Sequence, residues 1–549
     1  MTAARHPFAV ELRALLAIAA PLAAANVAQM LMGLTSTIMV GHLGSAALAS
    51  AGLGGSLYFT LVIVCRSVLA AVAPLAAHAI GADEHHEAGL LAGTGLVMAG
   101  IIAMPIIVVL RLLGPLLGAI GYSPVLAAGV GEYLSAVCWG APAFLAFEVL
   151  RALLAATSRA RAVMLAVVLA IPANALLGWT FIFGHLRMPA LGIVGAGYAT
   201  ATIQWSMALG LTLLLLTLPR QTTLRLPRQI AQRVRAILRL GLPIGGLIAL
   251  EVGVFAVAGI LMGLFGADAL AAHQLALNVA SLTFMIPLGI GQAATVRVAF
   301  ELGASAPRVA HRAGVVALLV GVIIMMACGL LIWMAPRAIA GVYLDLQDPA
   351  NHVTSVIVLE FLTVAAVFQV FDGIQVIAAG ALRGHRDTAV PLLIAAFGYW
   401  GIGFTGGWLL AFPLSCGPIG LWFGLAGGLA VVAGLLTLRL LIRSRTDLHQ
   451  GTEPAAYGRG RTMMQPAGSG LRSCSRKMTA SRIEGPLPTP RRPCISKSTG
   501  LVIKLGPTWV GPTRRGRDFF SDESRNPIGI AMHDCRRERL LGRKMIMHA

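Results

Sequence analysis

The chain repeats its own N-terminal half at an offset of 222 positions, and this repeat constrains the fold more than any other feature. The segment GHLGSAALA matches GLFGADALA, and both segments open an apolar run. The anchors of the repeat are Pro21/Pro243, Gly41/Gly263, Gly44/Gly266, Leu48/Leu270 and Gly81/Gly303. A repeat of this length predicts two similar helical bundles with a site between them. Within the same frame Glu251 occupies the place of neutral Gln29, so the two halves differ in charge.

Composition places both bundles in a membrane. The chain is 57% hydrophobic and only 12% charged, whereas soluble proteins contain about 25% charged residues. Its mean hydropathy is +0.81. Apolar runs of roughly 18 residues or more with few charges are typical of membrane spans. Twelve such runs lie near 12–37, 46–74, 88–113, 129–156, 162–184, 192–218, 240–265, 271–299, 313–335, 352–381, 388–411 and 418–443.

The predicted fold is therefore an all-α integral membrane protein with twelve transmembrane helices in two six-helix lobes. We expect residues 1–218 to form the N-terminal lobe and residues 240–445 the C-terminal lobe. A basic cytoplasmic loop over 219–239 is expected to join them. Residues 446–549 are expected to form a separate tail.

Arginine positions predict the orientation. Residues 1–445 contain 23 Arg and no Lys, and 19 of these Arg lie at the N-terminus, near the end of or after runs 4, 6, 8 and 10, or at the end of run 12. Cytoplasmic loops carry an excess of Lys and Arg. Both termini are therefore expected in the cytoplasm, with the protein crossing the bacterial inner (plasma) membrane many times. The six Arg of 219–239 give the strongest signal.

The tail from residue 446 has a different character. It holds 19 Lys plus Arg against 8 Asp plus Glu and lacks sustained hydrophobic periodicity. Such a segment buries too little apolar surface to order itself. We expect it to be disordered. It is either a basic tail that contacts anionic lipid or, as the abrupt change in residue usage favours, a stretch whose reading frame is not biologically meaningful, and we assign it no function.

Several function classes are disfavoured. The net charge of +20 does not indicate a nucleic-acid partner, because topology alone places Arg in loops and anionic lipid attracts them. The seven Cys lack metal-site spacing. The sequence has no Walker loop, HExxH or GxSxG motif. We therefore expect a protein that is not an enzyme, has no resident cofactor, and contacts membrane lipid.

Two carboxylates inside the apolar runs are the main candidates for chemistry. Glu251 lies about 11 residues into run 7 and Asp372 in the inner half of run 10. A charge at mid-membrane costs about 2.5–3.5 kcal/mol, so its presence calls for a reason. A hydrogen bond that only fixes helix packing is one reason. The other is ion coupling, because burial favours the protonated carboxyl whereas a bound cation favours the ionised one.

Two further charged groups lie in the runs. Glu148 has Arg151 three residues on, which predicts a local ion pair on one helix face. Arg66 is the lone base deep in a run, and the sequence does not identify its partner.

The order of several segments then resembles a known family. These are APLAAANVAQMLMGLTSTIMVGHLGSAALA, FGHLRMPALGIVGAGYAT, GLPIGGLIALEVGVF, ADALAAHQLALN and FDGIQVIAAGALRGHRDTAVP. Residues 10–443 resemble the multidrug and toxic compound extrusion (MATE) family, in its NorM-like branch. The resemblance implies a V-shaped pair of six-helix lobes that exports small cationic drugs in exchange for H⁺ or Na⁺. We expect such a protein to be a monomer.

The resemblance also assigns roles. It implies that Glu251 and Asp372 couple transport to protons or bind Na⁺. With the polar residues of the first and eighth runs, it suggests a substrate cavity that includes Gln29, Ser36, Asn174, Thr200 and Asn278. The sequence departs from the family pattern at Ser36, where many relatives have Asp, at Gly178, where some have Asn, and at Phe368, where some have Tyr. These departures shift the expected coupling to the C-terminal lobe.

One alternative stays open at this stage. A lipid-linked oligosaccharide or lipid flippase of the same two-lobe superfamily would need several bases deep in the spans to hold a pyrophosphate. Only Arg66 meets that description, whereas Glu251 and Asp372 make the interior acidic. The sequence therefore favours a cationic substrate.

Overall fold

The computed structural model describes residues 7–217 and 230–450, and every regular element in these ranges is helical. The described residues belong to one compact unit. They include twelve helical spans long and apolar enough to cross a membrane, which correspond one to one to the twelve predicted runs. The predicted all-α fold is confirmed. The predicted disorder of the tail concerns residues that lie, from 451 onward, outside the described ranges.

The N-terminal lobe contains six spans, two of which are built from more than one helix. Its elements are α1 (Pro7–Gly41), α2 (Ser45–Leu69), α3 (Val72–Gly81), α4 (His85–Ile120), α5 (Pro124–Val137), η1 (Cys138–Gly140), α6 (Ala141–Ala156), α7 (Ala160–Phe183) and α8 (Gly192–Leu216). Helices α2 and α3 together form the second span, and α5, η1 and α6 together form the fourth.

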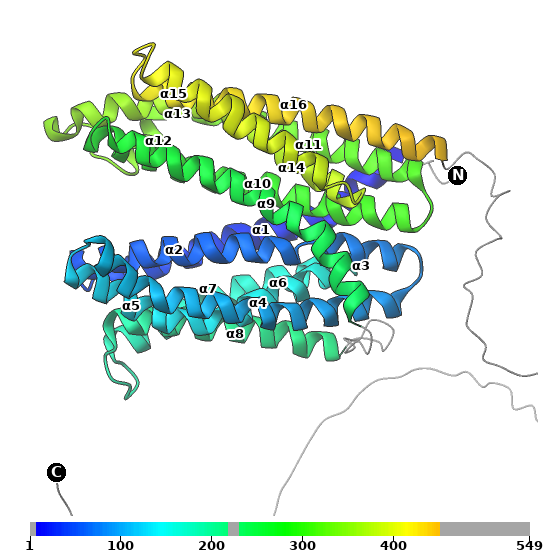
Figure 1. The fold of residues 1–549 in the computed structure, drawn as a ribbon, viewed down its shortest axis with the longest axis horizontal. Helices are drawn as coiled ribbons and strands as arrows, with labels where there is room; N and C mark the ends of the chain where they lie inside the picture. The colour runs from blue at the N-terminus through cyan, green and yellow to red at the C-terminus, as the bar shows by residue number, and fades with distance from the viewer. Residues whose placement is uncertain (1–6, 218–229, 451–549) are drawn as a thin grey trace, which may run out of the picture. The chain divides into compact units, whose positions relative to one another are not determined.

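The C-terminal lobe repeats this plan. Its elements are α9 (Ala231–Gly263), α10 (Ala267–Gly303), α11 (Pro307–Met334), α12 (Pro336–Gly341), η3 (Pro349–Asn351), α13 (His352–Gly384), α14 (Ala389–Ala395), η4 (Ala396–Phe404), α15 (Thr405–Ala411) and α16 (Pro418–Gln450). The eleventh span joins α14, the π-helical η4 and α15. Figure 1 shows the two bundles, the first in blue to cyan and the second in green to orange.

Two helix boundaries differ from the predicted segments. Helix α9 begins at Ala231, so residues 231–239 are helical rather than part of a loop. Helix α16 continues to Gln450, five residues beyond the predicted end of the lobe. The added part of α9 contains Arg233, Arg235 and Arg239, and arginine is a good helix former. The added part of α16 contains Asp447, which contacts His385 and Arg443. Residues 219–229 of the predicted loop lie outside the described residues.

The backbone preserves the internal repeat. Gly44 and Gly266, which precede α2 and α10, have φ angles of 105° and 103°. Glycine adopts this region at little cost, whereas a residue with a Cβ does not. Asp83 and Ser305, also 222 positions apart, share the left-handed conformation with φ of 63° and 56°. The repeat therefore specifies equivalent turns as well as equivalent helices.

The lobes meet through repeat-related helices. Helix α10 packs against α1 and α3, and α2 packs against α9. Gly81 and Gly303 lie in a reciprocal contact: a Cβ on Gly81 would come 2.0 Å from the carbonyl oxygen of Phe300, and one on Gly303 would come 2.1 Å from that of His78. His78 and Phe300 are themselves 222 positions apart, so this contact lies at the local symmetry axis of the two lobes.

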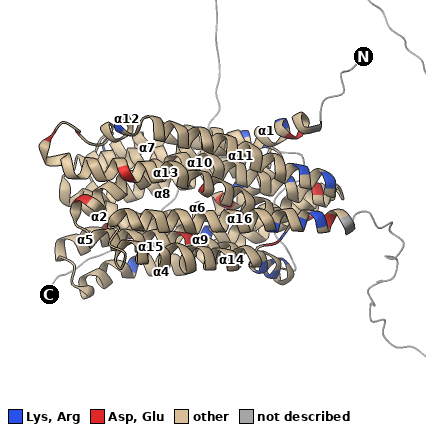
Figure 2. Cartoon of the chain, turned by 90° about the horizontal axis from the view of Figure 1, so that it is seen from above, with Lys and Arg blue, Asp and Glu red and all other residues tan. Residues whose placement is uncertain are grey.

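These contacts gather at one end of the bundles, which we call the inner end: the end where α1 begins and α16 finishes. Most Arg residues of the described ranges gather there too (Figure 2). Toward the opposite end of α1, by contrast, Leu31, Leu34 and Ile38 are exposed. In this structure the lobes are therefore joined at the inner end.

Candidate coupling site in the C-terminal lobe

Glu251 and Asp372 lie on different helices and share one partner. The side-chain amide nitrogen Nε2 of Gln375 lies 3.4 Å from Oε1 of Glu251 on α9 and 3.3 Å from Oδ1 of Asp372 on α13. Asp372 and Gln375 are buried, whereas Glu251 is half-buried. An amide nitrogen carries two hydrogens, so Gln375 can donate one to each carboxylate. The structure thus brings together the two acidic residues that the sequence singled out.

The π-helical segment η4 supplies two more contacts to this site. The Tyr399 hydroxyl donates to Oε1 of Gln375 at 2.9 Å, and the Trp400 indole nitrogen donates to the carbonyl oxygen of Leu250 at 3.1 Å. One contact orients the amide, and the other holds the backbone next to Glu251. Wide π-type turns within α-helices are frequent at functional sites because they change the direction in which side chains project.

Aromatic residues and one base lie near the carboxylates. Phe368, one turn before Asp372, is buried and meets Phe255 edge-on at a centroid distance of 6.0 Å, and Trp422 at 5.7 Å. The guanidinium of Arg383, two turns from Gln375 on the same helix, lies within electrostatic range of Glu251. Aromatic residues thus lie one helical turn from each carboxylate, Phe255 from Glu251 and Phe368 from Asp372, and Arg383 adds a positive charge within range of Glu251.

Candidate residues of the N-terminal lobe form a smaller, uncharged cluster. Asn174 on α7 donates through Nδ2 to Oγ of Ser36 at 2.9 Å, and its Nδ2 also lies 3.4 Å from the carbonyl oxygen of Met32. Ser36 in turn donates to Met32. The side chain of Thr200 donates to the carbonyl of Ala196 within its own helix, at 3.0 Å. Thus Asn174 and Ser36 come together, whereas Thr200 satisfies its hydroxyl locally.

Gln29 and Asn278 do not join either cluster. Gln29 is half-buried on α1 and Asn278 is exposed on α10, and neither side chain forms a hydrogen bond with another of the described residues. Both amides are thus available to a polar ligand at the surfaces where they lie.

The predicted ion pair of Glu148 is confirmed and proves to be part of a larger group. Arg151 Nη1 lies 3.3 Å from Oε1 of Glu148, and Arg66 Nη1 lies 3.1 Å from the same oxygen. Arg66, whose partner the sequence did not reveal, therefore reaches from α2 to α6.

Three residues of this cluster, Gln375, Arg383 and Tyr399, were not assigned to the site from the sequence. Gln375 lies three residues after Asp372, on the same helical face, which was a usable signal. Tyr399 gave a weaker one, as a polar aromatic residue in the glycine-rich stretch AFGYWGIGF. The partner of Arg383 depends on how α9 packs against α13, and no local pattern reveals it.

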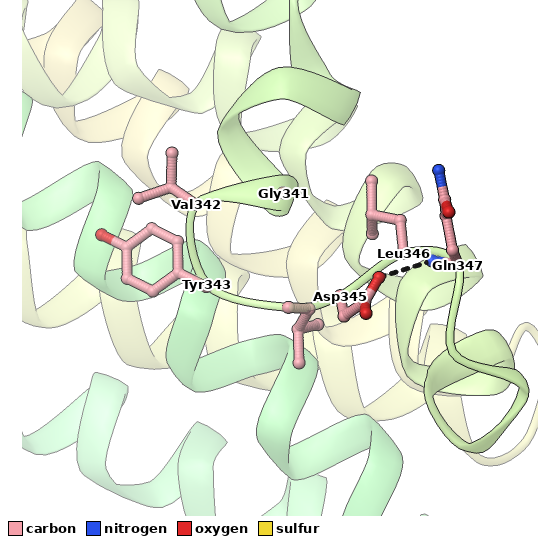
Figure 3. A pocket seen from close by; sticks show the side chains of 7 residues that line it. Gly341, Val342, Tyr343, Asp345, Leu346 and Gln347 are labelled. Carbon is pink, nitrogen blue, oxygen red and sulfur yellow. Dashed lines mark hydrogen bonds between the residues drawn. The ribbon is translucent and has the colours of Figure 1, made fainter.

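A separate surface pocket lies in the loop after α12 (Figure 3). It is lined by the consecutive residues 341–347. Its one carboxylate, Asp345, already accepts a hydrogen bond from the backbone nitrogen of Gln347 at 3.0 Å. This pocket is formed by one loop, and its only carboxylate is already hydrogen-bonded to the backbone. We therefore assign it no part in binding the transported cation.

Comparison with known proteins identifies the family. The MatE family profile matches residues 21–180 and 243–409, which are the two halves of the internal repeat. The chain belongs to the MatE family. It is 42% identical over 429 residues to the multidrug resistance protein NorM of Burkholderia vietnamiensis, covering 78% of this chain and 93% of that protein. It is 40% identical over 454 residues to a probable multidrug resistance protein NorM of Mesorhizobium japonicum, covering 82% and 96%.

Solved structures agree on the fold of this MatE chain. The eukaryotic MATE transporter AtDTX14 matches with a TM-score of 0.73 at 22% identity, over 81% of this chain and 100% of that one. An outward-facing multidrug resistance MATE family transporter matches with a TM-score of 0.72 at 20% identity, over 80% and 97%. The predicted fold class and family are confirmed, and a MatE chain is a membrane transporter rather than an enzyme.

Proposed function

We propose that this MatE chain is a secondary active antiporter that exports organic cations in exchange for H⁺ or Na⁺, with Glu251 and Asp372 as the coupling groups. One observation supports this more than any other. The two carboxylates converge from α9 and α13 on a single amide, that of Gln375.

The chemistry follows from this arrangement. Two carboxylates that share one amide donor repel each other when both are ionised, and a proton or a cation between them relieves the repulsion. A proton, Na⁺ and a cationic drug can therefore compete for the same negative charge. Competition of this kind exchanges one species for another as the site opens alternately to the two sides of the membrane.

The roles within the site differ by position. Glu251 is half-buried and Asp372 is buried, so we assign first contact with an arriving cation to Glu251. Tyr399 and Gln375 hold the geometry. Phe255 is half-buried and is supported by buried Phe368, so we assign to Phe255 the contact with the hydrophobic part of the drug.

The test removes charge while preserving size. In everted vesicles, ethidium transport by Glu251→Gln is compared with that of the unsubstituted protein under a pH gradient and, separately, under a Na⁺ gradient. Both the transport and the substrate-driven movement of the coupling ion should be lost, and Asp372→Asn should behave in nearly the same way. Whichever gradient drives the unsubstituted protein identifies the ion.

A matched control is available on the same helix as Asp372. Glu360 is an exposed carboxylate of α13, and Glu360→Gln removes one charge without touching the site. It should transport normally. Full coupled transport by Glu251→Gln at matched expression would overturn the proposal and leave Glu251 with a packing role only.

The N-terminal lobe contributes polarity rather than coupling charge in this proposal. Ser36 stands where many relatives carry an acid, and its hydroxyl pairs with Asn174. We assign Gln29, Thr200 and Asn278 to the substrate path together with this pair. Gln29→Ala should therefore change transport only mildly.

A flippase is less well supported. Its pyrophosphate ligand would require unpaired bases deep in the spans, but Arg66 and Arg151 are both paired with Glu148.

The same proposal includes placement in the cell. We infer a monomer, surrounded by lipid in the bacterial inner membrane, with both termini and the inner end in the cytoplasm. The arginines of the inner end support this orientation, and nothing in the site calls for nucleic acid. A cysteine at Gln229, in a chain without its native cysteines, should react with an impermeant thiol reagent in everted vesicles but not in intact cells. Labelling of intact cells would refute the orientation.

A further inference from the structure

A charged group in the N-terminal lobe reaches across to the other lobe. Arg66, Glu148 and Arg151 form a chain in which both guanidinium groups contact Oε1 of Glu148, at 3.1 and 3.3 Å. The side chain of Arg151 is only 5% exposed. A guanidinium so deeply buried must find partners for its hydrogens, because an unpaired buried charge is strongly destabilising.

Arg151 finds those partners in both lobes. Its Nη2 lies 2.6 Å from Oδ1 of Asn26 on α1 and 2.5 Å from Oε1 of Gln292 on α10. The amide nitrogen of Asn26 lies 3.5 Å from the carbonyl oxygen of Met285, also on α10. The two hydrogens of Nη2 are thus divided between the lobes, one to each.

Two ion pairs also cross between the lobes, nearer the inner end. Arg297 on α10 contacts both carboxylate oxygens of Glu11 on α1, at 3.0 and 2.9 Å. Arg233 on α9 lies 2.7 Å from Oε2 of Glu87 on α4. The pair of Arg233 is more exposed than the contacts of Arg151, and exposed pairs contribute little. Among these crossing contacts the side chains of Arg151 and Glu11 are each only 5% exposed, and Arg151 is the most deeply buried of the three arginines.

We propose that Arg151 is a positioning residue of the transport cycle, which holds the inner ends of the lobes together through Gln292 and releases Gln292 when these ends separate. The charged partner of Arg151, Glu148, lies in its own lobe, as does Asn26. Its charge therefore stays paired when Gln292 leaves. The contact that breaks is one hydrogen bond to a neutral amide, strong enough to favour the closed arrangement and weak enough to be broken in every cycle.

This inference goes beyond the proposed coupling site, since it concerns the other lobe and requires no particular coupling ion. The test measures the distance between the inner ends of the two lobes. His86 on α4 and Arg308 on α11 are exposed, lie at the inner ends of opposite lobes and are 222 positions apart. Spin labels are attached at these two positions in a full-length chain without its native cysteines. Pulsed electron paramagnetic resonance of the labelled protein in lipid nanodiscs then measures the separation of the inner ends.

Two substitutions of Gln292 should move this distance in opposite directions. Gln292→Met keeps the side-chain length but removes the hydrogen-bond acceptor. It should lower the ratio of the short-distance population to the long-distance population about tenfold. Gln292→Glu places a carboxylate against Arg151 and should raise that ratio. It should also lower the maximal transport rate while leaving the KM for ethidium near its original value, because the substrate site is unchanged.

The control uses the same helix and the same chemistry. Gln274 on α10 is exposed, and Gln274→Met should leave the distance distribution unchanged. An unchanged distribution in both Gln292 variants would overturn the proposal, as would a shift of both in the same direction. If Gln292→Met fails to yield a monodisperse protein, Gln292→Glu alone decides the outcome. The distances are measured without an ion gradient, so a failure here is separate from any failure of Glu251→Gln.

Discussion

The reciprocal glycine contact at the inner end leads to a quantitative prediction. Alanine at position 81 would place its Cβ 2.0 Å from the carbonyl oxygen of Phe300, and alanine at 303 would place it 2.1 Å from that of His78. Ordinary van der Waals contact begins at 3.4 Å, so the two helix ends must separate by about 1.4 Å. The atoms met are backbone carbonyls of helices, which cannot rotate away as a side chain would.

The cost of this separation can be estimated. Overpacking of a close contact costs about 1–3 kcal/mol, which corresponds to about 5- to 150-fold in an equilibrium constant. The cost applies only to the arrangement in which the inner ends touch. Gly81→Ala and Gly303→Ala should therefore shift the protein toward arrangements in which these ends are apart. The double substitution should shift it by less than the sum, because both act on one contact.

The assay is the distance between spin labels at His86 and Arg308, with ethidium export measured in parallel. Gly100→Ala is the control, because a Cβ at Gly100 meets nothing within 4 Å. The control should keep the original distances, while each substitution at the contact lengthens them and slows export. Unchanged distances in Gly81→Ala and Gly303→Ala, with a well-folded protein, would refute the reasoning that this contact closes the inner end.

Three further predictions follow from single contacts. Tyr399→Phe removes the hydroxyl that orients Gln375, so coupled ethidium transport in vesicles should fall about 2- to 10-fold while membrane insertion is unchanged; unaltered transport would exclude that role. Glu148→Gln leaves two guanidinium groups without their shared carboxylate and should cost about 3–5 kcal/mol, seen as a lower Tm in detergent; an unchanged Tm would contradict the burial argument. Truncation after Gln450, which keeps the contacts of Asp447 with His385 and Arg443, should preserve insertion and export, and loss of insertion would show that the tail is needed.

The fold was largely predictable because the relevant signals are local. A run of about 20 apolar residues can satisfy its backbone in lipid only as a helix, so composition alone predicted all twelve spans. The repeat predicted the two lobes, since equal sequences form equal turns, as the φ angles at Gly44 and Gly266 illustrate. Helix ends were less predictable: α9 extends through arginines that an apolar run does not include.

The candidate site was predictable only in part. Glu251 and Asp372 could be identified because a carboxylate in an apolar run is costly wherever it lies. That both contact the same amide depends on how α9 and α13 pack, and the hydroxyl of Tyr399 reaches that amide from a π-helical turn. Contacts of this kind join residues 24 to 124 positions apart, and helical periodicity predicts contacts only between residues a few positions apart.

The sequence by itself determined the membrane environment, the number of spans, the two-lobe plan and the identity of the intramembrane charges. Each of these depends on the transfer of side chains between water and lipid, which is a property of the residue and its near neighbours. Only the tertiary structure decided which charges meet. Arg66 and Arg151 share Glu148, and Arg151 extends on to Gln292 of the other lobe. Those partners are set by helix packing within and between the lobes, because a buried charge must be satisfied by whichever polar group the packing places beside it.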